Sequence, residues 1–168
     1  LFTGDCLMAI GVSDKKISFL QLVKVLFFVY IGNFIGGLAT AACMYFSGQF
    51  DYTGGALGAY TIKVALAKVS LTPVQGITSG ILCNILVCAA VLMAMSSKDV
   101  TGKLLASFFV IMPFVTGGFE HCVANMYYFS AANMWSMKTF YYVLMMILGN
   151  SVGSILLALG NKYCIKKS

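Results

Sequence analysis

The chain has 168 residues, of which 60% are hydrophobic and 10% are charged, and its mean hydropathy is +0.92. A soluble domain carries about 25% charged residues because its exterior must be polar, so this composition excludes an ordinary soluble domain. The net charge of +6 comes from lysines that lie between apolar runs instead of clustering with Arg and aromatic side chains, which argues against a nucleic-acid partner. We therefore expect the lipid bilayer to be the solvent for most of the surface.

The chain opens on Leu1-Phe2-Thr3-Gly4-Asp5, which has neither an initiator Met nor the charged start of a signal peptide. The natural N-terminus is therefore expected to lie upstream. The apolar stretch 1–12 is about half as long as a membrane span, and it ends at the polar segment 13–16. We interpret it as a half-helix that begins at a break.

Three later segments are long and apolar enough to cross a membrane. A hydrocarbon core of about 30 Å requires about 20 apolar residues in a helix, and residues 19–46, 74–95 and 140–159 reach this length. A fourth segment, 104–129, is interrupted by Thr116-Gly117-Gly118 and then carries Glu120 and His121. We predict three full spans and one broken helix.

The lysines indicate which ends of these spans face the cytoplasm. Three clusters fall at alternate ends of successive spans and therefore on one side of the membrane, which the positive-inside rule identifies as cytoplasmic: Lys15 and Lys16, Lys98 and Lys103, and Lys162, Lys166 and Lys167. The opposite side receives the loops 50–61 and 130–137. Lys63, Lys68 and Lys138 are exceptions to this rule.

The chain contains an internal repeat. A shift of 117 positions places Phe2 on Phe119, and it places the sequence Gly-Asn-x-x-Gly at 32–36 on the one at 149–153. An odd number of spans between the copies makes them run in opposite directions, as in transporters and channels with broken helices at the midplane. The predicted fold is an all-α, inverted-repeat membrane bundle, a single transmembrane domain 1–168 with half-repeats 1–63 and 64–168. Roughly fifty residues, the counterpart of one helix and a half, would precede Leu1.

Polar side chains within apolar segments are candidate functional residues, because an ionisable group in a span costs several kcal/mol unless it is paired or hydrated. Glu120 either accepts hydrogen bonds from backbone groups freed by the break or takes part in function. His121 is the single histidine and the stronger functional candidate. The repeat places Thr3 opposite Glu120, so Thr3 should approach the same midplane.

Other polar residues keep two interpretations each. Lys68 either draws anions into an outer mouth or snorkels to the membrane surface. Three amides lie within spans, where they either join helices or line a water-filled path: Asn33, Asn84 and Asn150. Among these, Asn84 is the one we most readily assign to a pore.

The sequence predicts no cofactor and no metal. The six cysteines lie inside or at the ends of apolar runs without C-x-x-C spacing, and a single histidine cannot complete a metal site. We interpret the cysteines as reduced, small hydrophobic side chains.

Three strings in this sequence resemble those of the formate/nitrite transporter family, and the resemblance extends over essentially the whole chain. The most specific is the one around His121; the strings are Leu1-Phe2-Thr3-Gly4-Asp5, Gly80-Ile81-Leu82-Cys83-Asn84, and Gly118-Phe119-Glu120-His121-Cys122-Val123-Ala124-Asn125-Met126. The resemblance implies an aquaporin-like homopentamer in the inner or plasma membrane, in which each protomer has its own pore for small monovalent anions such as formate, nitrite or hydrosulfide.

The same resemblance implies roles for individual residues. His121 is similar to the central pore histidine of the family, Thr3 to its partner on the first broken helix, and Lys68 to the vestibule lysine. Asn84 and Asn150 resemble the amides near the pore. The apolar constrictions on either side of the histidine correspond, by the same resemblance, to Leu1, Phe2, Val87 and Phe114. Gly4-Asp5-Cys6 looks more like the hydrosulfide branch, so hydrosulfide is the substrate that the sequence favours.

Two other functions stay open from the sequence. The first is an intramembrane enzyme that uses Glu120 and His121 as acid and base, although the chain has no evident nucleophile partner, metal set or cofactor loop. The second is a structural membrane subunit, which would leave both residues without a chemical role. An anion channel accounts for them best.

Overall fold

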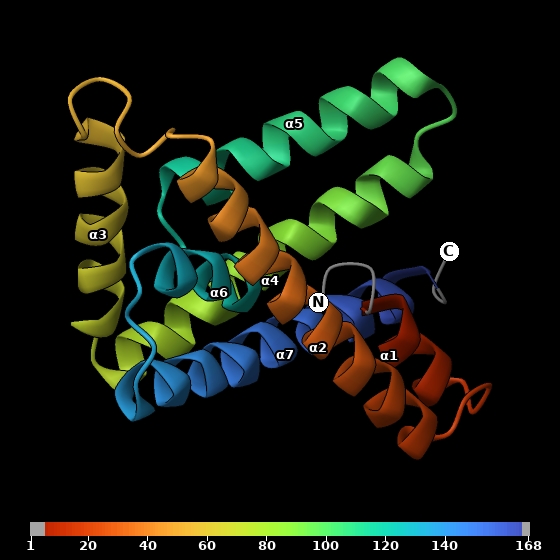
Figure 1. The fold of residues 1–168 in the computed structure, drawn as a ribbon. Coiled ribbons are helices and arrows are strands. Elements are labelled where there is room, and N and C mark those ends of the chain that lie inside the picture. Colours follow the sequence, from red (N-terminus) through yellow and green to blue (C-terminus); the bar gives the residue numbers. More distant parts are fainter. Residues whose placement is uncertain (1–5, 166–168) are drawn as a thin grey trace.

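The computed structural model describes the backbone of residues 6–165 and the side chains of residues 8–164. This part of the chain is all helical and has no strand (Figure 1). Its helices are α1 (Cys6–Ser13), α2 (Phe19–Phe46), α3 (Ala56–Val69), α4 (Pro73–Ser96), α5 (Val100–Thr116), α6 (Cys122–Ala131) and α7 (Met137–Ile165).

The three predicted full spans are confirmed as α2, α4 and α7, each long and apolar enough to cross a membrane. Local sequence explains where two of them begin. Ser18 and Gln21 form a capping box at the start of α2, and Thr72 and Gln75 form another before α4, where Pro73 occupies the first turn.

The predicted interruption of the fourth segment is also confirmed. Helix α5 ends at Thr116 and α6 begins at Cys122, so residues 117–121 form the break. Gly118 has a φ of +66°, a left-handed conformation that side chains with a Cβ rarely adopt. The backbone there turns away from the helix axis, and two short helices replace one continuous span.

Helix α3 was not predicted from the sequence. The predicted loop 50–61 ends early, because a helix begins at Ala56 after Gly54 and Gly55, whose φ values are +66° and +81°. Thr61, Ala65 and Val69 recur every fourth residue and are buried, which gives α3 one packed face. The predicted boundary between half-repeats, at 63/64, falls inside this helix.

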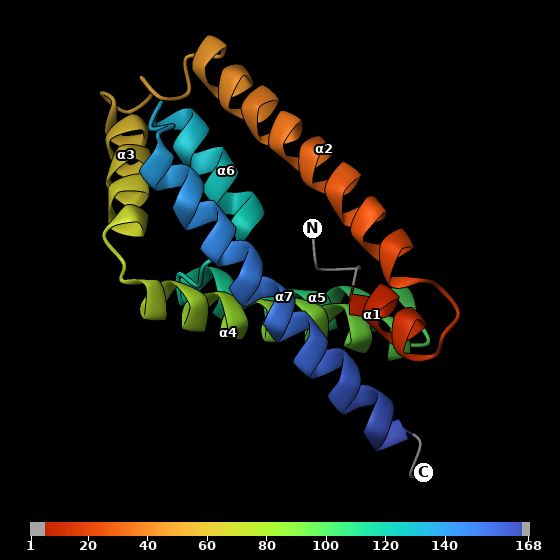
Figure 2. The ribbon, with the colours of Figure 1, turned by 90° about the horizontal axis from the view of Figure 1, so that it is seen from below.

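The helix bounds follow the repeat. Shifted by 117 positions, α1 becomes 123–130 and falls within α6, and α2 becomes 136–163, within two residues of the bounds of α7. The packing is reciprocal as well, because α1 contacts α7 while α2 contacts α6 (Figure 2). A two-fold relation between two copies produces this exchange of partners.

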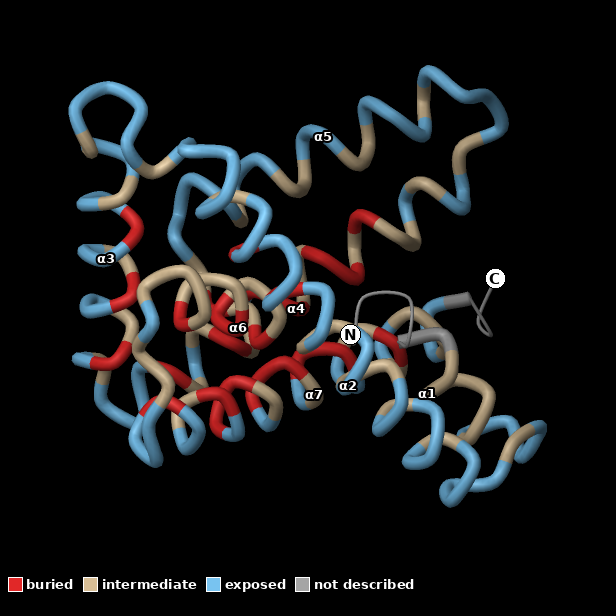
Figure 3. The backbone as a smooth tube through the Cα atoms, in the orientation of Figure 1, coloured by how far each residue is buried: buried red, intermediate tan, exposed pale blue. Residues whose placement is uncertain are grey.

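The two ends of the bundle differ in their lysines. The α1–α2 connection, the α4–α5 connection and the C-terminal end of α7 all lie at the right of Figure 1, which agrees with the predicted single side for the lysine clusters. At this end Lys162 Nζ lies 2.6 Å from Asp14 Oδ1 and donates to Ser13 Oγ at 2.6 Å. Buried positions concentrate on α6, α7 and the middle of α4, whereas α2 and α5 are mostly exposed (Figure 3).

Candidate functional site

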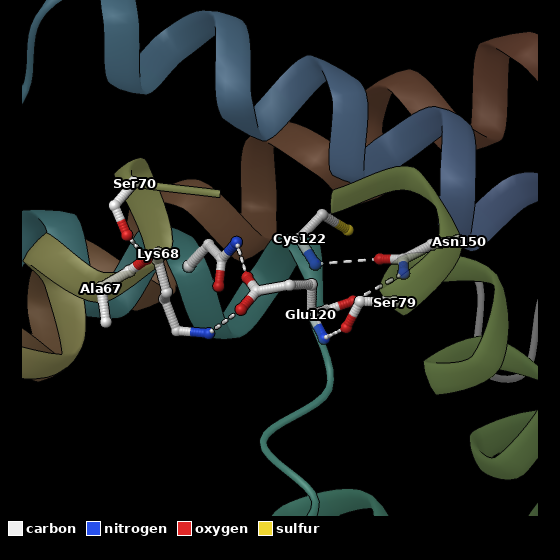
Figure 4. A network of polar contacts seen from close by, with 8 residues as sticks. Ala67, Lys68, Ser70, Ser79, Glu120, Cys122 and Asn150 are labelled. Atoms are coloured by element: carbon white, nitrogen blue, oxygen red, sulfur yellow. Dashed lines mark hydrogen bonds and ion pairs between the residues drawn. The ribbon is translucent and has the colours of Figure 1, made fainter. Parts of the chain in front are cut away.

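The break between α5 and α6 frees backbone groups that side chains from two other helices bind. Ser79 Oγ on α4 accepts from Glu120 N at 3.0 Å. Asn150 on α7 spans the break: its Oδ1 accepts from Cys122 N at 2.9 Å, and its Nδ2 donates to Glu120 O at 3.0 Å and Gly80 O at 2.9 Å. Figure 4 shows these contacts converging on the break. Because the buried backbone groups have partners, the irregular segment is stable inside the bundle.

The Glu120 carboxylate belongs to a buried charged network. Its Oε1 accepts from Lys68 Nζ at 2.9 Å, and its Oε2 accepts from Asn125 Nδ2 at 2.8 Å. The exposed fractions of the two charged side chains are 10% for Lys68 and 5% for Glu120. The Lys68 ammonium also lies 5.5 Å from the centre of the Tyr128 ring. Two opposite charges therefore compensate each other between α3 and the start of α6.

The position of His121 fixes which of its nitrogens can donate. It is the N-cap of α6, and its Nδ1 accepts from Val123 N at 3.3 Å. A neutral imidazole whose Nδ1 is an acceptor carries its proton on Nε2, so Nε2–H is the donor. The ring packs edge to face against Phe114, with centroids 6.0 Å apart. The acid–base pair proposed for an enzyme finds no support here, because the Glu120 carboxylate bonds Lys68 and Asn125.

Asn84 joins α4 to α7. Its side chain is fully buried, and its Nδ2 donates to Asn150 O at 2.8 Å and to Ser154 Oγ at 2.7 Å. Within the part of the chain whose side chains are described, no donor reaches Oδ1 of Asn84 or of Asn125. Of the two sequence interpretations, the contacts favour the joining of helices for Asn84 and Asn150.

Two cavities lie along helices α4 and α5, and residues of both helices line each of them. The outer one has a volume of about 830 Å³, and Lys68, Glu120 and Phe114 contribute to its wall. The inner one has a volume of about 440 Å³ and is bounded by Val87 on α4 and by α5. The structure thus places one predicted constriction residue at each cavity.

The structure brings some of the residues singled out from the sequence into contact with one another, and it adds two that were not. Thr3, Leu1 and Phe2 lie outside the described residues. Asn125 and Ser79 were not predicted as site residues. An amide within a span needs a partner, which was a usable signal for Asn125; Ser79 gave none, because a serine in a helix commonly bonds its own backbone.

The family comparison covers nearly the whole chain: a family model described as "Formate/nitrite transporter" matches residues 1–163. The formate channel FocA of Haemophilus influenzae is 43% identical over 76% of this chain and 45% of its own length. The formate-nitrite transporter of Plasmodium knowlesi is 32% identical over 100% of this chain and 58% of its own length. The chain therefore spans about half the length of these curated relatives.

Solved structures show the same architecture. An FNT family ion channel superimposes with a TM-score of 0.85 and 29% identity, over 98% of this chain and 68% of that one. A pentameric formate channel with formate bound gives a TM-score of 0.81 and 28% identity, over 91% and 69% of the two chains. The all-α membrane channel fold is thereby confirmed.

Proposed function

Because this chain belongs to the formate/nitrite transporter family, we propose that its protein conducts small monovalent anions across the membrane. It is a multi-pass membrane protein, and the relatives named above are channels and transporters rather than enzymes. A path along α4 and α5, from one cavity to the other past His121, fits this function.

The observation that carries the proposal is the position of His121 at the break. A hydrogen-bond donor, Nε2–H, belongs to a ring that contacts Phe114, and Phe114 also lines the outer cavity. An apolar constriction opposes a bare anion, because desolvating a charge costs far more than a few contacts return. A donor at this point is therefore what an anion path requires.

The mechanism follows from that requirement. The anion loses its water at apolar constrictions, for which we propose Leu1, Phe2, Val87 and Phe114. His121, with Thr3, then donates a hydrogen bond to the anion. If the Nε2 proton is transferred to the anion, water must return a proton to the ring, so that the imidazole stays neutral while the weak acid crosses the second constriction in its neutral form. Formic acid, nitrous acid and hydrogen sulfide are small and uncharged, which suits such a path.

Lys68 acts at the outer cavity in this proposal. Its charge is compensated by Glu120 at 2.9 Å, so the pair exerts a weaker field than a free lysine would. An ammonium has three N–H donors, and only some of them are used by Glu120. Lys68 therefore contributes to anion entry mainly by hydrogen bonding at the cavity wall, while Asn84 and Asn150 keep the broken helix in position beside the path.

Assembly and substrate are inferred from the relatives. The solved formate channel is pentameric, which supports a homopentamer here. The names of the relatives favour formate over hydrosulfide as the main substrate. Hydrosulfide, which Gly4-Asp5-Cys6 suggests, is the narrower alternative, and the same flux experiment tests both.

The test is anion uptake by liposomes that contain the intact protein, with formate, nitrite, hydrosulfide and chloride compared over a series of pH values. His121→Phe keeps the bulk of the ring and removes its donor. A hydrogen bond to a charged group contributes about 1.5–3 kcal/mol, so weak-acid uptake should fall about tenfold or more.

Two controls make this test decisive. Size-exclusion chromatography must show the same assembly for His121→Phe and the wild type. His121→Asn can donate a hydrogen bond but no proton, so it should retain anion flux without pH dependence if the hydrogen bond is sufficient. Wild-type flux and pH profile in His121→Phe would show that the ring is only packing and that the mechanism is wrong.

A further inference from the structure

The inner cavity lies nearer the α4–α5 connection than the outer one does. It lies on the helical turns that follow Val87 along α4 and precede Phe114 on α5. In Figure 1, α4 and α5 converge toward their connecting loop, at the end that the lysine clusters identify as cytoplasmic. The inner cavity is therefore the cytoplasmic approach to the constriction at Val87.

The wall of this cavity is apolar except at two side chains. Six of its residues are apolar, and the two polar ones are Lys103 and Ser107 on α5. Residues four apart lie on the same face of a helix, so Lys103 and Ser107 belong to one wall, about one helical turn apart. One cation and one hydroxyl on an otherwise apolar wall suit a small anion better than they suit a cation or a neutral polar molecule.

The charge of Lys103 is less compensated than that of Lys68. No ion pair of Lys103 occurs within 8–164, whereas Lys68 lies 2.9 Å from Glu120. The nearby carboxylate of Asp99 caps α5, where its Oδ1 accepts from Gly102 N at 2.8 Å. Lys98 adds a second positive charge outside the cavity wall. The inner mouth thus carries a net positive charge that the outer cavity lacks.

We propose that Lys103 and Ser107 form an anion-binding subsite in the inner cavity, which concentrates the permeant monoanion on the cytoplasmic side of Val87. This inference rests on the proposed function and adds a site to it. Lys103 attracts the anion, and the Ser107 hydroxyl donates to it one helical turn closer to the constriction. The two cavities then differ in charge. The outer one presents the Lys68–Glu120 ion pair, and the inner one presents Lys103, which has no ion pair among the described residues.

The first experiment measures formate currents through the intact protein in planar bilayers at about 10 mM salt, where the Debye length is about 30 Å. With Lys103→Gln, the current of anions that enter from the Lys103 side should fall about two- to threefold. This is the factor expected when one charge at several ångströms in water is removed. Anions that enter from the other side should be affected less, so the variant should rectify. Impermeant salt added on the Lys103 side alone should abolish the difference.

Matched variants exclude a general structural effect. Lys103→Arg keeps the charge and should retain wild-type currents, and Lys98→Gln removes an adjacent charge outside the cavity and should change them little. If Lys103→Gln and Lys98→Gln behave alike, the subsite is overturned. If the wild type carries no formate, the proposed function fails instead.

A second experiment tests the subsite without conduction. A thiol introduced by Ser107→Cys is treated with anionic and cationic methanethiosulfonates, and mass spectrometry follows its modification apart from that of Cys43 and Cys164. Adding Lys103→Gln should lower the ratio of anionic to cationic reaction rates about fivefold, because the lost charge acts on both reagents in opposite senses. An unchanged ratio would overturn the subsite even if formate currents are normal.

Discussion

The two Gly-Asn-x-x-Gly sequences occupy matching positions in α2 and α7, yet their surroundings differ. A Cβ on Gly149 would lie 2.6 Å from Ile77 O, and a Cβ on Gly153 would collide with Ile81 O, so α7 packs on α4 at backbone contact. A Cβ on Gly32 or Gly36 would meet nothing within 4 Å among the described residues. The motif permits close packing, but a partner helix must supply it.

The asparagines of the two copies differ in the same way. Asn150 spans the break with three side-chain hydrogen bonds to backbone groups. Asn33, its counterpart, donates to Val29 O within its own helix at 2.8 Å. One sequence motif thus serves the site in the second copy and only local helix structure in the described part of the first. Among the described residues, the two copies share helix bounds but not the contacts of this motif.

The largest expected effect comes from Gly153→Ala. The added methyl group must separate α4 from α7, because the obstacle is a backbone carbonyl, and overpacking of this kind costs about 1–3 kcal/mol or more. Gly36→Ala is the matched variant: its methyl group meets nothing within 4 Å among the described residues and gains up to about 1 kcal/mol of helix propensity. Thermal melting of the purified protein in detergent compares them. Equal losses at both positions would show that α2 is as tightly packed as α7 in the intact assembly.

Asn150→Ala should have the next largest effect. It leaves Cys122 N and two carbonyl oxygens without their side-chain partner, at about 1–3 kcal/mol for a buried unsatisfied group, whereas Asn33→Ala loses one hydrogen bond worth about 1 kcal/mol. Melting temperature and formate flux are measured together. Loss of flux should accompany Asn150→Ala alone, and a comparable loss in Asn33→Ala would remove the contrast between the copies.

Asp14→Asn should have the smallest effect. It weakens the ion pair that joins the α1–α2 connection to α7, and the Asp14 side chain is 33% exposed, so the loss should stay below about 1 kcal/mol. The difference from wild type in melting temperature should shrink at high salt. A large, salt-independent loss would mean that this contact is as important to the first copy as Asn150 is to the second.

The sequence was sufficient for features that depend on local composition. Run length and apolarity predicted α2, α4 and α7, and Gly117 and Gly118 predicted the break. The repeat predicted which helices correspond. Helix α3 was missed because its 14 residues are too short for a span and carry Lys63 and Lys68; its first residues, 56–61, fall in the predicted loop.

The contacts of the site join residues that are far apart in the sequence, so composition and local pattern could not predict them. Nothing in the sequence places Lys68 beside Glu120, because the two residues are 52 positions apart and α3 itself was not predicted. Lys68 was expected at an outer mouth or at the membrane surface, and both expectations assumed a lysine without a partner. The sequence singled out His121 and Lys68 as candidates, whereas the structure supplied the contacts made by Asn125 and Ser79.

The exchange of partners between the copies affects how the chain is synthesised. Helix α1 leaves the ribosome well before α7, against which it packs, and Lys162 reaches Ser13 across 149 positions. With 8 residues, α1 is too short to cross a bilayer by itself. It must therefore wait at the membrane surface, or against helices already inserted, until α7 arrives. The membrane insertion machinery therefore has to tolerate a half-helix that lacks its packing partner until α7 has been made.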